Sequence, residues 1–596
     1  MDLLTCMQIS LKGIKFFFRK HWIPLFFSIL VGLISYAPIF LAWEAIGSDY
    51  KGVAFTYQAN EDVYMARIHE VTEGYYDAKS PIFYEYKNAF NPLYPSGEYL
   101  YALPAIIFGL NVSTIVLLAK FIFPAILFLL IYFFCLRLLT DGNKESNNSE
   151  VKLYATSIGL LITLGYDIVD WRYALTLLSG QAQELQLLLW TRPVNPISGA
   201  LFLSVFLLCL WKLHKSEEYN LGAVIMAGLC LGFSISYFFT FTICGAILAM
   251  LFLFNVLKKN YRVLKGYIVL GVIALVVQLP YWLDTLNAKR MGILEKISLQ
   301  SGLFLQHTSI INKFLLFGTI IFIICSVFLN KTKVRSLFTE KWWQFCAILL
   351  AGSWLAFNQQ IITGRTVWPY HFVQYTIPIA MVVIMTVLYR SFKIGWVRKL
   401  FAIVIICVSL GLGLRSAQTY TYALADYRSM QDIGPVYDWL NNNAQDPCVV
   451  FVLESGEKFT NYIPAYTNCD VYYSGFVFSG IPPERVAHNY LSKIRLSVVS
   501  AEEVEGYLDT HRSEIRYMFF HDWHQLFGTD DAQWIKDKID ELVSSYSIFA
   551  RQNFKNELNR FRLDYILSRE QLVPEIIKEL NLREMLVSDP YYLYSF

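Results

Sequence analysis

Long apolar stretches dominate the first 416 residues of the 596-residue chain. A membrane-spanning helix needs about 20 predominantly apolar residues, and eleven stretches are long and apolar enough to be predicted as spans. They cover residues 22–46, 113–138, 153–169, 195–213, 220–238, 241–257, 266–283, 311–329, 342–360, 372–389 and 399–416. The apolar segment 99–110 is too short to span and predicts a helix that lies at the membrane surface. The pattern predicts a polytopic α-helical membrane protein.

Basic residues gather in alternate loops between the predicted spans. The clusters lie at 137–152, 212–215, 258–265, 331–341 and 390–399. Loops rich in lysine and arginine stay in the cytoplasm, so the pattern predicts a cytoplasmic N-terminus, and an odd number of crossings places the C-terminus outside. Four basic residues precede the first span and no small-residue cleavage site follows it, which predicts an uncleaved first helix.

The last part of the chain has a different pattern. Residues 426–596 carry mixed charge, and short runs rich in β-branched and aromatic residues alternate with helical segments. The predicted strands are 448–453, 470–473, 517–520 and 563–567. Strands that alternate with helices are typical of a small parallel sheet of α/β type. We therefore expect two domains, a transmembrane module over 1–416 and an extracytoplasmic α/β domain over 417–596.

Composition narrows the class of protein. With 55% hydrophobic and only 16% charged residues, the chain has the composition of an integral membrane protein. A net charge of +3 without a basic stripe argues against a nucleic-acid partner. No glycine-rich nucleotide motif follows a predicted strand. Most of the ten cysteines lie in apolar spans, but Cys448 and Cys469 lie in the polar region, where export would allow either a disulfide or two free thiols.

The most informative polar residues are two adjacent carboxylates, Glu61 and Asp62, in the first external loop at about 47–112. Helical spacing over 60–70 places them at a helix N-terminus, where the dipole favours anions and where Asn60 is positioned to cap. One carboxylate could take a proton from an acceptor hydroxyl, or the pair could hold a divalent metal against a donor phosphate. The alternative is a solvated helix end.

A second acidic pair, Asp167 and Asp170, lies at the external end of the third predicted span. Their i, i+3 spacing places both on one helical face. They are candidates for binding the acceptor, together with Arg172, or for holding Mg²⁺ or Mn²⁺ between Asp62 and Asp167. The alternative is a cap at the membrane edge, with Asp170 beside Arg172.

Cationic candidates for a phosphate leaving group also lie at external span ends. They are Arg192, Arg365 and His371. Arginine is suited to bidentate phosphate binding, although interfacial arginines also serve as plain anchors. The loop after the seventh span is either a lid or a connector; its charged residues are Asp284, Lys289, Arg290, Glu295 and Lys296.

This layout resembles the membrane-embedded C-type glycosyltransferase superfamily (GT-C), which includes protein O-mannosyltransferases, oligosaccharyltransferase subunits and lipid A aminoarabinose transferases. The resemblance rests on a first external loop that opens near Asn60-Glu61-Asp62 and runs into Tyr64-Met65-Ala66-Arg67, followed by many spans and an external domain. The stretch Asn358–Arg365, followed by His371, is similar to a late loop of bacterial members. As architecture the resemblance covers about residues 1–416.

The resemblance implies an inverting transfer of a sugar from a polyprenyl-phosphate or polyprenyl-diphosphate donor on the extracytoplasmic face of a bacterial inner or plasma membrane. The acceptor is left open as a glycan, a lipid or a protein. By position, Glu61 and Asp62 inherit the role of base or metal ligand. The order Glu-Asp replaces the Asp-Glu of the mannosyltransferases, and no Asp-x-Asp occurs in the second external loop, which puts metal dependence in doubt.

Two other classes of function remain open at the level of the sequence. A lipid or glycan transporter or flippase typically shows inverted repeats and polar residues near mid-span, whereas the polar candidates here gather at span ends and no repeat is evident. A non-catalytic membrane scaffold with an external binding domain is the third alternative.

Overall fold

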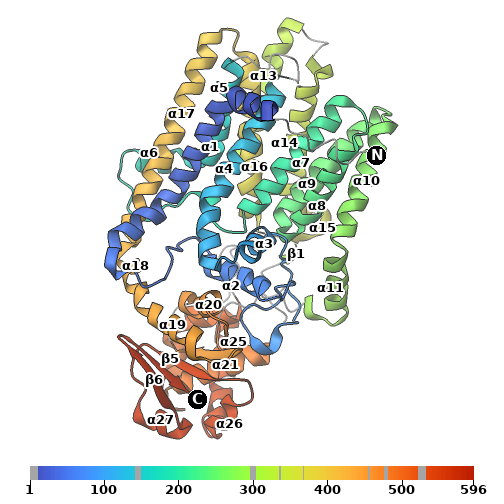
Figure 1. The fold of residues 1–596 in the computed structure, drawn as a ribbon. Helices are drawn as coiled ribbons and strands as arrows, with labels where there is room; N and C mark the ends of the chain where they lie inside the picture. Colours follow the sequence, from blue (N-terminus) through green and yellow to red (C-terminus); the bar gives the residue numbers. More distant parts are fainter. Residues whose placement is uncertain are drawn as a thin grey trace.

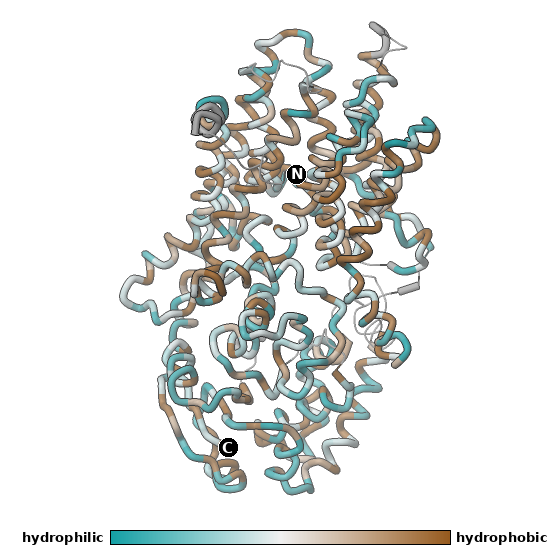
Figure 2. The backbone as a smooth tube through the Cα atoms, turned by 45° about the vertical axis from the view of Figure 1, so that its right-hand side comes forward, coloured by the Kyte–Doolittle hydropathy of each residue, from teal (hydrophilic) through white to brown (hydrophobic). Residues whose placement is uncertain are grey.

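The computed structural model describes residues 11–140, 149–294, 304–305, 307–333, 337–366, 368–453, 457–474, 481–520 and 532–596. Its helical bundle occupies the upper part of Figure 1, and the C-terminal sheet with its helices occupies the lower part. Figure 2 shows that apolar residues are concentrated in the bundle, while hydrophilic residues are more frequent around the C-terminus. The domain boundary near residue 417 stays a prediction.

Each predicted span overlaps a helix. These helices are α1 (Leu11–Ile46), α4 (Val112–Leu139), α5 (Ser149–Thr163), α7 (Ile197–Ser216), α8 (Leu221–Phe233), α9 (Phe238–Leu257), α10 (Tyr261–Val277), α13 (Lys313–Lys333), α14 (Lys341–Phe357), α16 (Pro369–Ser391) and α17 (Gly395–Gln418). In the described ranges, six helices are long and apolar enough to cross a membrane, or seven if α10 and the bent α11 (Leu279–Arg290) form one span. Eleven crossings therefore remain a prediction.

Close contacts between bundle helices depend on small residues. A Cβ at Gly159 of α5 would lie 2.8 Å from the Phe128 ring of α4, and one at Gly352 of α14 would lie 2.7 Å from Ile247 of α9. Small residues allow membrane helices to approach closely, because packing rather than the hydrophobic effect drives their association in lipid. The helix α4 lies at the centre of this packing, between α1, α5 and α7.

The first loop folds into α2 (Glu61–Thr72) and α3 (Tyr99–Phe108), with a short 3₁₀ turn η2 (Tyr84–Tyr86) between them. Both helices were expected. One face of α3 buries Tyr101, Ala102 and Ala105, while Ile107 and Phe108 are exposed, which is the pattern expected of a helix at a membrane surface. The buried Arg67 of α2 bonds Glu98 at 2.5 Å and organises the loop.

The expected cap at Asn60 is wrong. Asn60 adopts a left-handed conformation with φ of +56°, and its side chain makes no capping hydrogen bond to α2. The chain enters the helix through a tight turn, in which the Glu61 amide bonds the Gln58 carbonyl at 3.2 Å. Asparagine tolerates this left-handed conformation better than most residues do.

The chain leaves α17 through η8 (Thr419–Ala423), α18 (Leu424–Met430) and η9 (Gln431–Ile433) into the C-terminal domain. Its further elements are α19 (Gly434–Asn443), β3 (Cys448–Val452), α20 (Glu457–Tyr466), β4 (Cys469–Val471), α21 (Pro483–Leu496), α22 (Val504–Thr510), α23 (Arg512–Phe519), α25 (Ala532–Phe549), α26 (Phe554–Leu558), β5 (Tyr565–Ser568), α27 (Pro574–Leu580), β6 (Arg583–Ser588) and β7 (Tyr591–Ser595).

The sheet is mixed rather than parallel. Its strand order is β4-β3-β5-β7-β6; the first three strands are parallel, and β7 and β6 pair antiparallel. The predicted strand at 517–520 is wrong, because most of it belongs to the helix α23. Ile515 and Met518 are buried at a spacing of three residues, so the aromatic run lies on an amphipathic helix.

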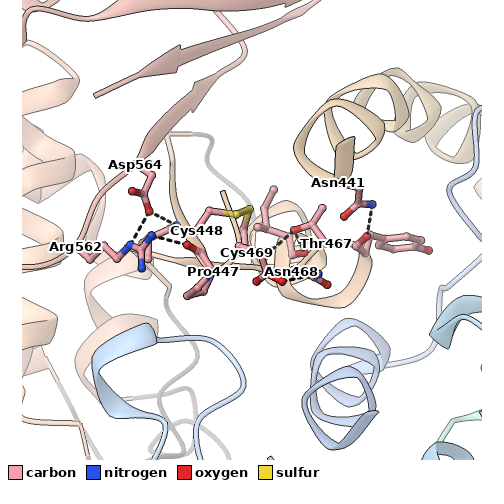
Figure 3. Close-up of a disulfide and its surroundings, with 12 residues drawn as sticks. Asn441, Pro447, Cys448, Thr467, Asn468, Cys469, Arg562 and Asp564 are labelled. Atoms are coloured by element: carbon pink, nitrogen blue, oxygen red, sulfur yellow. Dashed lines mark hydrogen bonds and ion pairs between the residues drawn. A yellow bond between two sulfur atoms is a disulfide. The ribbon is translucent and has the colours of Figure 1, made fainter. Parts of the chain in front are cut away.

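Cys448 and Cys469 form a disulfide, which resolves the alternative left open by the sequence. The two residues are directly opposite each other in the parallel β3–β4 register. Figure 3 shows the disulfide beside Arg562, which bonds Asp564 at 2.9 Å. Asp564 also accepts a hydrogen bond from the backbone N–H of Val449 at 2.8 Å. The strand that carries Cys448 is therefore hydrogen-bonded to the residue before β5 next to the disulfide.

The C-terminal domain packs directly on the first loop. The Gln431 side chain accepts from the Lys51 amide at 3.0 Å and donates to the Val53 carbonyl at 3.0 Å. Lys87 of the loop bridges Glu70 at 2.7 Å and Asp470 at 2.6 Å. The helices α2 and α20 also lie side by side at this contact.

Replacing Gly434 with alanine should weaken this packing, because a Cβ there would overlap the Lys51 carbonyl oxygen. Overpacking of this kind costs about 1–3 kcal/mol, so a lower thermal unfolding temperature of the purified protein is expected. Gly506→Ala is the matched control, since a Cβ there meets no atom within 4 Å among the described residues. Equal unfolding temperatures for the two variants would contradict the close approach.

Candidate functional site

Glu61 is enclosed at the N-terminus of α2. Its carboxyl group is paired with Lys120 of α4 and accepts a hydrogen bond from the backbone N–H of Gln58 at 3.0 Å. Both charged side chains are buried, with 1% of Glu61 and 3% of Lys120 exposed. Burial raises the pKa of Glu61, and the Lys120 ammonium opposes that rise. Glu61 therefore connects the first loop to the core of the bundle.

Asp62 is less enclosed than Glu61, with 8% of the residue exposed. One of its oxygens accepts a hydrogen bond from the side-chain amide of Asn461, on α20, at 2.8 Å. The Ser474 hydroxyl in turn donates a hydrogen bond to the side-chain oxygen of Asn461 at 3.3 Å. The C-terminal domain thus orients the Asp62 carboxylate, and the N-terminus of α2 favours its charge.

Arg192 lies in the segment 188–196, which is hydrogen-bonded to the first loop just before α2. Gln58, three residues before Glu61, donates to the Leu188 carbonyl at 2.9 Å and to the Thr191 hydroxyl at 2.7 Å. On the other side of Arg192, the Tyr375 hydroxyl of α16 bonds the Pro196 carbonyl at 3.0 Å. The segment is therefore held between the first loop and the bundle.

Arg192 itself lies over α2. Its guanidinium carbon is 5.6 Å from the centre of the Tyr64 ring, a cation–π distance. Tyr64 follows Asp62 by two residues on the same helix. The Arg192 charge also acts on Tyr237 and His371, and the Tyr237 hydroxyl bonds His371 Nδ1. The structure thus brings Arg192, Tyr237 and His371 into one cluster beside Tyr64 of α2.

Other predicted residues lie elsewhere. Arg365 is exposed on the two-residue strand β2 (Arg365–Thr366), which pairs with β1 (Phe304–Leu305). Asp170 caps α6 (Trp171–Leu178) by accepting the Arg172 and Tyr173 amides at 3.2 and 3.4 Å. Arg172 stacks at 5.5 Å on the Trp171 ring. The geometry of Asp170 and Arg172 is that of the helix-cap alternative.

Asp167 lies in the 3₁₀ turn η4 (Tyr166–Val169), half-buried and near Tyr173. Among the described residues, no group of three or more His, Cys, Asp or Glu side chains is arranged to hold a metal ion. Glu61 is paired with Lys120, and Asp62 accepts from an amide. Both carboxylates thus have protein partners in the structure, and the metal stays a prediction on which no proposed step depends.

The predicted lid segment contacts the first loop. Asp284, on α11, lies 3.3 Å from Lys79, and Lys289 and Arg290 form the last turn of the same helix. Glu295 and Lys296 lie outside the described residues. A role as a lid remains a prediction.

Sequence reasoning missed Lys120, and a signal for it was present. Lys120 is a charged residue inside the predicted span 113–138, where an ionisable group is costly and usually has a functional partner. Gln58 and Asn461 were also missed, and they have no comparable signal, because isolated amides in polar segments are common. Their importance depends on contacts across 130 and 399 residues of sequence.

The fold defines a helical membrane protein with a C-terminal α/β domain, and the candidates Asp62 and Arg192 both lie at α2, where the two parts meet. No family model matches the sequence, and no curated protein matches it either. Among solved structures, the chain is similar to the crystal structure of ArnT from Cupriavidus metallidurans in the apo state. The identity is 9%, the TM-score is 0.44, and the match covers 93% of this chain and 96% of that chain. We transfer no residue role from this likeness.

Proposed function

We propose that the protein is a membrane glycosyltransferase that transfers a sugar from a polyprenyl-phosphate donor to an acceptor on the extracytoplasmic face. One observation carries the proposal: α2 brings the Asp62 carboxylate and, through Tyr64, the Arg192 guanidinium to the junction of the apolar bundle and the polar domain. A general base and a phosphate-binding cation are the two groups that this transfer needs.

In the proposed reaction, Asp62 accepts the proton of an acceptor hydroxyl as that oxygen attacks the anomeric carbon of the donor sugar. A new carbon–oxygen bond forms, and the bond between the anomeric carbon and the phosphate oxygen breaks with inversion. The polyprenyl phosphate leaves with the bonding electrons and gains negative charge. Arg192 stabilises that charge, because a guanidinium can donate two parallel hydrogen bonds to a phosphate.

The neighbouring residues have positioning roles in this proposal. Glu61 is paired with Lys120 and joins the start of α2 to α4, whereas Asp62, with 8% of the residue exposed, is the better candidate for the base. His371, held by Tyr237 and stacked on Phe239 at 4.8 Å, supports the side of the site occupied by Arg192. A lipid donor would reach the site from the bundle, and the acceptor from the polar domain.

The test is a product analysis with the full chain reconstituted in phospholipid vesicles. A panel of polyprenyl-phosphate sugars is supplied together with envelope extracts as the acceptor source. The expected products are free polyprenyl phosphate and a new glycosidic bond, both detected by mass spectrometry. Asp540→Asn, an exposed substitution on α25, is the matched control and should keep activity. Movement of an unchanged lipid-linked sugar across the bilayer, without bond formation, would instead establish a flippase.

A further inference from the structure

A cavity of about 610 Å³ lies where the first loop meets the C-terminal domain. Its walls come from residues 51–52, the last turn of α2, the junction of α3 and α4, the helix α19 and the end of α20. Its lining includes none of Glu61, Asp62 and Arg192. The cavity is therefore separate from the candidate site, and its volume is within the range of about 300–1,000 Å³ that is typical of ligand sites.

Two helices connect the cavity to Asp62. At one end of the pair, Asn461 of α20 bonds Asp62 of α2 at 2.8 Å. Toward the other end, His69 Nδ1 donates to the Pro464 carbonyl at 2.9 Å, beside the cavity. Asp62, His69 and Glu73 are spaced for one face of α2. At a rise of 1.5 Å per residue, Glu73 lies about 16 Å along the helix from Asp62, a length of a few sugar rings.

The lining combines planar polar side chains with aromatic rings. Glu73, Asn111, Asp438 and Asn441 offer carboxylate and amide groups. Such groups can exchange hydrogen bonds with neighbouring hydroxyls of a sugar. The buried Tyr437 and the partly buried Tyr466 line the same cavity as a stacked pair, with ring centres 5.2 Å apart and planes 6° apart. Aromatic rings pack on the carbon–hydrogen faces of sugars and provide apolar area with little loss of conformational freedom.

The charges of the lining disfavour an anionic ligand. Lys51 pairs with Asp432 at 3.0 Å, and burial lowers the pKa of His69, which keeps the imidazole neutral near pH 7. Glu73 and Asp438 add negative charge. A phosphate group would meet repulsion here, whereas a neutral polyhydroxylated ligand would not.

We propose that this cavity binds a saccharide, namely the part of the acceptor that lies a few sugar rings from the transferred position. The role as acceptor rests on the proposed glycosyltransferase function, but saccharide binding in the cavity does not. The same chemistry would recognise a free oligosaccharide and the head group of a glycolipid.

The test measures binding without turnover. The full chain is reconstituted in phospholipid nanodiscs free of glycoside detergents and titrated with the free trisaccharides maltotriose, chitotriose and mannotriose. The glycolipid arm uses the same three saccharides carried on a dodecyl chain. We expect saturable binding in at least one arm and a loss of at least tenfold in affinity in Glu73→Ala/Asp438→Ala. Glu505→Ala, an exposed acid on α22, is the control and should bind as wild type.

Binding in the free arm identifies an oligosaccharide site, and binding only in the glycolipid arm identifies a lipid-carried head group; both support the proposal. No saturable binding in either arm, or unchanged affinity in a folded double variant, overturns it. An Asp62→Asn variant that binds saccharide but gives no product would leave both proposals standing. Saccharide binding by a wild-type protein that forms no glycosidic bond would overturn only the enzymatic function.

Discussion

Replacing Asp62 with asparagine is expected to reduce sugar transfer by about 10²–10⁴-fold, the range typical of losing a general base. The amide retains the size of the side chain, but it cannot accept the acceptor proton. Binding of the polyprenyl-phosphate donor should be little changed, because Arg192 remains in place over Tyr64. The measurement is the rate of polyprenyl-phosphate release by the reconstituted full chain.

Glu61→Gln provides the internal comparison for Asp62→Asn. Because Glu61 is paired with Lys120 and almost fully buried, its loss should act mainly on stability and less on the rate. The exposed Asp540→Asn should match wild type in both respects. An Asp62→Asn variant with wild-type rates, or a Glu61→Gln variant that folds fully but is inactive, would reject Asp62 as the base.

Replacing Lys120 with methionine is expected to lower the free energy of unfolding by about 3–5 kcal/mol, because it leaves the buried Glu61 carboxylate without its partner. The double variant Lys120→Met/Glu61→Gln should recover most of that loss, since neither buried charge remains. The measurement is the thermal or denaturant unfolding of the purified protein in one detergent.

Lys212→Met is the matched control for Lys120→Met. It replaces an exposed lysine near the end of α7 and should change stability by much less. If the single Lys120→Met variant were as stable as wild type, or if the double variant were no better than the single one, the Lys120–Glu61 pair would not organise the site.

The elements of the bundle could be predicted because each depends on a local property. An apolar stretch of sufficient length forms a helix in lipid regardless of distant residues, since every backbone polar group must be satisfied within the segment. Helix α2 was predictable for a related reason, because its apolar spacing is contained in twelve residues. The C-terminal sheet was predicted less well, since the β6–β7 hairpin acquires its place only by pairing antiparallel with β5.

The tertiary contacts separate the candidate residues, whose roles stay predictions. Arg192 lies over Tyr64 of α2, the helix that begins with Glu61 and Asp62, and His371 bonds Tyr237, whereas Arg365 is exposed on β2, and Asp170 and Arg172 belong to the cap of α6. The sequence places Arg192, Arg365, His371, Asp170 and Arg172 at predicted span ends, and this position alone cannot rank them. What separates them is whether a distant segment holds each residue in place, as Gln58 does for the segment that carries Arg192.

By itself, the order of apolar and polar residues determined that this is a helical membrane protein with a polar α/β domain after the bundle, and it marked the acidic start of α2. Only the tertiary structure decided that Glu61 meets Lys120 and that Asp62 meets Asn461, 399 residues later in the chain. The physical reason is the distance along the chain over which each property acts. Burial of an apolar stretch follows from composition over a few turns, while the pairing of single charged or amide groups depends on how helices pack across the molecule.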